Sequence, residues 1–212
     1  MRNFIFISII VLFSVCAGSC SSGVVLSGDW GVLWCGDSMT KIMRDTPVPG
    51  NKISSVEISA ARNEFESFQI VLRPNKALSN VRVTTRTING PGGAKIEAWS
   101  IVPRNVEYVH VPASSIGSEV SGASPGAYPD LLPEFKPFAA PANMNSPVWV
   151  TVYAGPKTAP GEYTGVFEIT ADGMPKLNLP LRVRVWDFEL PTVSSLRTSF
   201  ARDMEKAASH QG

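Results

Sequence analysis

Side chains able to carry out chemistry are few in this 212-residue sequence, and their spacing fits no common catalytic site. The two histidines, His110 and His210, lie far apart. No cysteine or histidine cluster has zinc-ligand spacing, no glycine-rich phosphate loop joins a strand to a helix, and no G-x-S-x-G nucleophile motif occurs. His110 in "YVHVP" is most simply a strand residue. We therefore assign no catalytic residue, no metal ligand and no cofactor to the chain.

Carboxylates are the remaining candidates, because glycoside hydrolysis uses two of them on opposite sides of a bond. Glu64 and Glu66 in "ARNEFESF" would share one face of a strand, which favours a solvent-facing or ion-paired role. Asp187 in "WDF" stands at a strand end, where a cap or a hydrogen bond between domains is simpler than catalysis. Asp130 and Tyr128, in "AYPDLLP", are the ligand contacts that we would test, with a purely structural loop as the alternative.

Tryptophans offer a second kind of site, because their flat apolar rings can stack on sugars as well as pack in a core. Most of the five stand in alternating apolar stretches, so we expect packing in the core or at a domain interface. They are Trp30, Trp34, Trp99, Trp149 and Trp186.

Short alternating stretches, separated by Gly, Pro and Asn, dominate the chain before residue 200 and indicate strands. Two such stretches flank "ADGM" near residue 172, and Asp-Gly between alternating stretches is a strong hairpin signal because Gly adopts positive φ easily. The pattern predicts an all-β fold over residues 25–190, a two-sheet antiparallel β-sandwich of immunoglobulin or fibronectin type. The face of the last strand that packs on the core would hold Leu179, Leu181, Val183 and Val185.

The segment from Pro112 to Pro141 is different, because it is rich in Ser, Gly and Pro and has no sustained period. A long connection of this kind within a compact domain is usually functional or disordered. We therefore expect an irregular loop here, which would contain Tyr128 and Asp130.

The N-terminus predicts export. Arg2 precedes "FIFISIIVLFSVCAG", which is shorter than the roughly 20 apolar residues of a membrane-spanning helix, so residues 1–20 read as a signal peptide. "AGSC" resembles a bacterial lipobox that would place a lipid on Cys20, and ordinary signal-peptidase cleavage is the alternative. If Cys20 carries lipid, Cys35 has no disulfide partner and reads as a small buried residue. We expect a bacterial envelope lipoprotein, held to the membrane by its lipid alone, or a periplasmic or extracellular protein.

The charge balance excludes one class of partner. Lys and Arg number 19 against 18 Asp and Glu, and no basic patch stands out. Proteins that bind nucleic acids normally carry such a patch, so we expect no nucleic-acid partner.

Four stretches in order, "AARNEFESFQIVLRP", "YPDLLP", "NMNSPVWVTVYAGPKTAPGEYTGVFEI" and "LPLRVRVWDFELPTVSSLRTSF", resemble the N-terminal domain of glycoside hydrolase family 123 and the related domain-of-unknown-function family 4091. The resemblance implies a β-sandwich that precedes a (β/α)8 barrel. Characterised members are β-N-acetylgalactosaminidases, in which an adjacent Asp-Glu pair of the barrel assists attack by the substrate's own 2-acetamido group. That pair has no counterpart in this sequence, so no catalytic residue is assigned by resemblance.

Residues 191–212 read as a linker and the start of a missing catalytic barrel. Pro191 cannot donate to a strand ladder, "LRTSF" resembles a first barrel strand, and a barrel takes roughly 200 residues or more. Our first hypothesis is a non-catalytic accessory sandwich that packs against and supports the barrel of the same parent chain, a glycosidase. The alternative is a free-standing cell-surface module that binds a carbohydrate or a protein.

Overall fold

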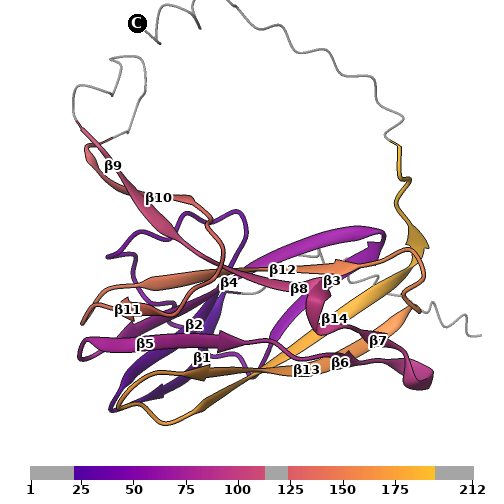
Figure 1. Cartoon of the computed structure of the whole chain (residues 1–212), viewed down its shortest axis with the longest axis horizontal. Helices are drawn as coiled ribbons and strands as arrows, with labels where there is room; N and C mark the ends of the chain where they lie inside the picture. The colour runs from indigo at the N-terminus through magenta and orange to yellow at the C-terminus, as the bar shows by residue number, and fades with distance from the viewer. Residues whose placement is uncertain (1–21, 113–123, 194–212) are drawn as a thin grey trace, which may run out of the picture.

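The computed structural model describes residues 22–112 and 124–193, which form an all-β fold (Figure 1). Its helical content in these residues is two single 3-10 turns, η1 (Pro91–Gly93) and η2 (Ala98–Ser100). The strands are β1 (Gly23–Gly28), β2 (Gly31–Asp37), β3 (Val56–Arg62), β4 (Glu64–Pro74), β5 (Leu78–Thr84), β6 (Ile88–Asn89), β7 (Lys95–Ile96), β8 (Ile101–Asn105), β9 (Glu107–Val111), β10 (Gly126–Leu131), β11 (Phe138–Ala140), β12 (Ser146–Ala154), β13 (Gly161–Thr170) and β14 (Leu177–Glu189).

Two large sheets account for most of these strands. The first has the order β1-β2-β4-β12-β8, with antiparallel pairing throughout. The second has the order β11-β5-β13-β14-β3, and the short strand β6 pairs with β13 on one side and with β7 on the other. The prediction of a purely antiparallel sandwich is wrong at one edge, because β14 pairs with β3 in parallel. A parallel neighbour needs a long connection rather than a tight turn, and here the chain passes through both sheets between β3 and β14.

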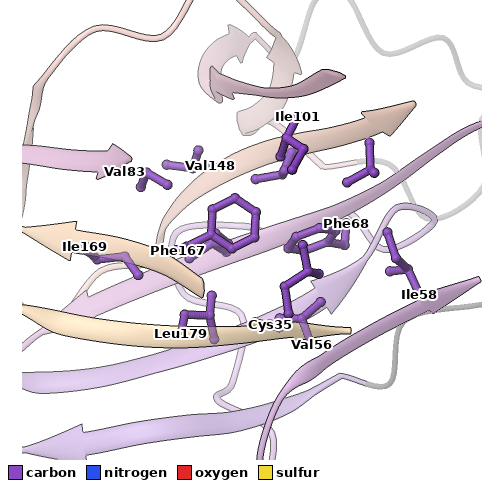
Figure 2. Close-up of a cluster of buried hydrophobic side chains, with 14 of the residues drawn as sticks. Cys35, Val56, Ile58, Phe68, Val83, Ile101, Val148, Phe167, Ile169 and Leu179 are labelled. Atoms are coloured by element: carbon purple, nitrogen blue, oxygen red, sulfur yellow. The ribbon is translucent and has the colours of Figure 1, made fainter. Parts of the chain in front are cut away.

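The strands and two short turns given above confirm the all-β prediction. The two large sheets share one hydrophobic core, which is the packing of a β-sandwich. Phe68 on β4 and Phe167 on β13 meet edge to face at 5.9 Å between ring centroids, which joins one sheet to the other. Figure 2 shows both rings within the buried cluster. Cys35 is buried in the same cluster, as the sequence predicts.

The β13–β14 hairpin confirms the strongest local prediction. Its strands pair from Gly161 opposite Val185 to Ile169 opposite Leu177, and Gly173 in the connecting loop has φ of 75°. Core-facing and exposed residues alternate strictly along β14 from Leu177 to Val185. Pro180 is tolerated within this central strand because β3 pairs with β14 only from Leu181 onward.

The irregular loop predicted over residues 112–141 is partly wrong. β10 pairs with β9 in a separate two-stranded sheet, and β11 pairs with β5 at the edge of the second sheet. The β9–β10 hairpin extends away from the two large sheets (Figure 1). The sequence hides β10 because Pro129 lies within it and the register shifts between Pro129 and Leu131, so residues do not alternate cleanly. β11 is only three residues long.

Several predictions concern residues outside the described part of the chain. They are the signal peptide over residues 1–20 with Cys20, the middle of the predicted irregular loop at residues 113–123, and the barrel strand expected in residues 194–212, which also hold His210. Within the described part of the chain, no helix is long and apolar enough to cross a membrane.

Glu64 and Glu66, at the start of β4, have structural surroundings. The Glu64 carboxylate accepts a hydrogen bond from the Ala61 backbone N–H at 2.6 Å and ties the turn between β3 and β4. Burial raises the pKa of Glu66 and the charge of Glu64 raises it further, whereas a hydrogen bond from the Ser67 backbone lowers it. The folded chain therefore holds this proton at a pH where the unfolded chain has released it, so ionisation of Glu66 costs stability.

We expect Glu66→Gln to make the protein more stable than wild type at pH 7, by less than about 1 kcal/mol because the carboxyl keeps contact with water. The difference should vanish well below pH 4.5, the ordinary pKa of glutamate, because the Glu66 carboxyl is then protonated in both the folded and the unfolded chain. Urea unfolding at several pH values measures this difference in the free energy of unfolding.

Glu168→Gln is the matched control, and we expect it to make the protein less stable than wild type at pH 7. Hydrogen bonds from Arg86 and Lys176 lower the pKa of Glu168, so its stabilisation is present at pH 7 and is lost in acid. A Glu66→Gln protein no more stable than wild type at pH 7 would contradict this reading.

Candidate functional site

An open pocket of about 230 Å³ lies on the outer face of the first sheet. Its floor is formed by Gln69 of β4 and Trp149 of β12, which are directly paired across the two strands. We call it the Asp130 pocket, because Asp130 is the single carboxylate among its lining residues. The full lining is Ser38, Met39, Thr40, Lys41, Gln69, Val106, Pro129, Asp130, Leu132 and Trp149.

One wall is the turn that follows β2. The Asp37 carboxylate accepts hydrogen bonds from the backbone N–H groups of Met39 and Thr40, each at 2.8 Å, and from the Thr40 hydroxyl. Gln69 is buried and donates from Nε2 to the carbonyls of Asp37 and Thr40, both at 2.8 Å. A short Asp side chain commonly closes such a turn. The turn is therefore held by Asp37 within it and by Gln69 from the sheet below it.

The opposite wall is the end of β10 and the residues that follow it. Pro129 pairs with Tyr108 and Leu131 pairs with Glu107, which leaves Asp130 as an extra residue in a bulge. Bulges redirect a side chain relative to the regular pleat. Arg104, on the neighbouring edge strand β8, donates a hydrogen bond to the Leu132 carbonyl at 3.2 Å and holds this wall against the sheet.

Two side chains hold the segment that follows the pocket turn, Asn145 just before β12 and Tyr108 on β9. The buried amide of Asn145 donates to the carbonyls of Met43 and Thr46, at 3.0 and 2.8 Å. The Tyr108 hydroxyl donates to the Ile42 carbonyl at 2.7 Å. Burial raises the pKa of Tyr108 to about 12, against the opposing effect of the Arg44 cation over its ring, so the phenol stays a neutral donor.

The two predicted ligand contacts have different positions. Asp130 is exposed and lines the pocket, although it lies in a strand bulge rather than in an irregular loop. Tyr128 is not among the lining residues, and its hydroxyl donates to the Ser124 carbonyl at 2.6 Å within the hairpin. His110 stands on β9 opposite Ala127, as the strand reading predicts.

Trp149 is the pocket residue for which the sequence reading favoured packing. Its indole Nε1 donates to the Thr151 hydroxyl at 3.2 Å, and the ring is partly exposed. The alternation of β12 contains the missing signal, because Val148 and Val150 face the core and must leave Trp149 on the outer face. Of the other tryptophans, Trp34 is buried, whereas Trp99 on η2 is 75% exposed.

We searched the described part of the chain for metal ligands and the Asp130 pocket for a second carboxylate. No group of three or more His, Cys, Asp or Glu side chains there could hold a metal ion. In the Asp130 pocket the carboxylate faces no second acid among the lining residues. What the pocket offers is a flat apolar ring, one carboxylate and one ammonium group.

Sequence comparison decides the family. The family model described as glycoside hydrolase 123 N-terminal domain matches residues 35–171. The chain belongs to this family. Every residue that lines the Asp130 pocket falls within the matched part of this glycoside hydrolase 123 N-terminal domain. A comparison with curated proteins finds no match.

A solved structure with the same fold is a family 123 glycoside hydrolase from Clostridium perfringens, studied for its hydrolysis of glycolipid glycans. The two chains share 19% sequence identity with a TM-score of 0.57, and the match covers 64% of this chain and 23% of the Clostridium chain. At that identity the likeness concerns the fold. The glycoside hydrolase 123 N-terminal domain described here thus corresponds to less than a quarter of the larger protein.

Proposed function

We propose that this chain is the non-catalytic accessory domain of an exported glycoside hydrolase, and that it packs against and supports a catalytic (β/α)8 barrel of the same parent protein. Family membership carries the proposal, because the matching family is defined as the N-terminal domain of glycoside hydrolase 123 proteins. The share of the Clostridium chain that matches, 23%, leaves most of that hydrolase for other parts. The substrate class we propose for the parent is a glycan with a β-linked N-acetylgalactosamine.

An aromatic pair at the surface, in which Phe65 is exposed and Tyr153 is half-buried, supports a contact with a following domain. Phe65 on β4 is 66% exposed and stacks on Tyr153 of β12, with ring centroids 4.3 Å apart. Asn63 accepts a hydrogen bond from the Tyr153 hydroxyl and donates to the carbonyl of Leu190, just after β14. The pair therefore stands beside the point where the chain leaves the second sheet. The exposed Phe65 ring at this point is apolar surface that a following domain would cover.

Export and lipid attachment at Cys20 belong to the same proposal and rest on the sequence of residues 1–20. The simplest experiment on the whole proposal is to read the gene beyond the codon for Gly212. We expect coding sequence for a barrel that contains an adjacent Asp-Glu pair. A stop codon there, with no barrel-coding sequence downstream, would contradict the accessory role.

A further inference from the structure

We propose that the Asp130 pocket binds one neutral pyranose unit of a glycan. This inference goes beyond the accessory role, because the pocket is built entirely from described residues of this chain and needs no catalytic domain. Its lining comes from five separate parts of the sequence, the 38–41 turn, Gln69, Val106, the 129–132 segment and Trp149.

The apolar part of the pocket suits the C–H face of a sugar ring. Trp149 lies in the floor, and the hydrogen bond from its Nε1 to Thr151 restrains the indole. Met39 and Leu132, on the two walls, are 89% and 37% exposed, so both present apolar surface to solvent beside the indole. Amphipathic rings such as indole contribute large contact area at low entropic cost.

The polar part of the pocket suits hydroxyl groups. Asp130 and Lys41 both line it, and neither side chain makes a hydrogen bond or ion pair with another side chain in residues 22–112 and 124–193. A carboxylate accepts hydrogen bonds and an ammonium group donates them. A singly charged ligand would be attracted by one of the two groups and repelled by the other, so its charge brings no net gain, whereas a neutral polyol can accept a hydrogen bond from Lys41 and donate one to Asp130.

The pocket is also largely pre-formed, which lowers the cost of binding. The Asp37 carboxylate and Gln69 hold the first wall, and Arg104 holds the second. None of these three side chains has to be reordered when a ligand enters, so the contacts with Trp149 and Asp130 contribute more fully to affinity.

The test is ligand-observed NMR titration of the purified chain with two neutral probes, N-acetyl-D-galactosamine and methyl β-D-galactopyranoside. We expect saturable binding with a dissociation constant in the millimolar range, as for a few favourable contacts on an open site. Asp130→Ala should weaken binding about 10- to 100-fold, because a hydrogen bond to a charged group contributes about 1.5–3 kcal/mol. Trp149→Ala should remove detectable binding.

Trp99→Ala is the matched control, since Trp99 is highly exposed but lies outside the pocket, and it should bind like wild type. Asp130 is exposed, so its substitution keeps the fold and remains informative if Trp149→Ala is unstable. Binding of neither sugar, or binding that Asp130→Ala leaves unchanged, would overturn the proposal. Binding of L-leucine in place of both sugars would overturn it too, because a zwitterion can also use Lys41 and Asp130. Sugar binding without a downstream barrel would refute only the accessory role, and a barrel beside a pocket that binds no sugar would refute only this inference.

Discussion

Replacing Phe167 by alanine should lower the free energy of unfolding by about 3–5 kcal/mol, the usual cost of removing a buried aromatic ring from a core. Phe167 is 2% exposed, and its ring meets Phe68 of the opposite sheet. Removing the ring reduces the apolar area that folding buries, and it also leaves a cavity between the two sheets. Domains of this size have a free energy of unfolding of about 5–15 kcal/mol, so the loss is a large share of the whole.

Phe65→Ala is the matched control, because Phe65 is also a phenylalanine of the sandwich but is 66% exposed on the outer face. Its truncation should cost about 1 kcal/mol or less, mainly the stacking on Tyr153. Both values follow from denaturant unfolding monitored by circular dichroism. Equal losses for the two variants would mean that the inter-sheet core does not hold this fold together.

Asn145→Ala should cost about 1–2 kcal/mol, because it removes two part-buried hydrogen bonds, each worth about 0.5–1.5 kcal/mol. The Met43 carbonyl keeps a bond from the Thr46 backbone N–H and the Thr46 carbonyl keeps one from Arg73, both at 3.2 Å, so neither is left unpaired. Through its bonds to Met43 and Thr46, Asn145 holds the segment that follows the pocket turn. The Asn145 Oδ1 atom is buried without a partner, so its removal offsets part of the cost and keeps the estimate below the sum.

The control for Asn145 is Asn75→Ala. Asn75 also donates from its side-chain amide to a backbone carbonyl, that of Asp29 at 3.1 Å, but it does so at the surface. Water can replace that bond, so we expect a loss of about 0.5 kcal/mol or less. The same unfolding measurement applies. If Asn145→Ala were no more destabilising than Asn75→Ala, the buried amide would not be what holds the segment.

Local alternation was enough to predict the principal strands. β14 has nine successive residues that alternate between core and solvent, and the Asp-Gly loop before it carries its own turn signal. The same reasoning places Trp149 on the face opposite Val148 and Val150. These features depend on neighbours within a few residues, which is the range that a sequence pattern reports.

Features that depend on distant partners could not be predicted in this way. The parallel pairing of β14 with β3 joins segments more than a hundred residues apart, and the residues of neither strand indicate which strand will pair with it. The bulge at Asp130 interrupts the pattern that would have revealed β10. Gln69 reads as an outward-facing polar residue on β4, yet it is buried because the turn after Asp37 folds over it. The pocket exists only once these segments meet.

Hydrolysis of an aryl β-N-acetylgalactosaminide tests the accessory role most directly, compared between the purified 212-residue chain and the protein extended through the reading frame beyond Gly212. We expect the extended protein to release the aryl group and the 212-residue chain to show no rate above buffer, because the catalytic acids belong to the proposed barrel. Hydrolysis by the 212-residue chain alone would contradict the proposal that this domain is non-catalytic.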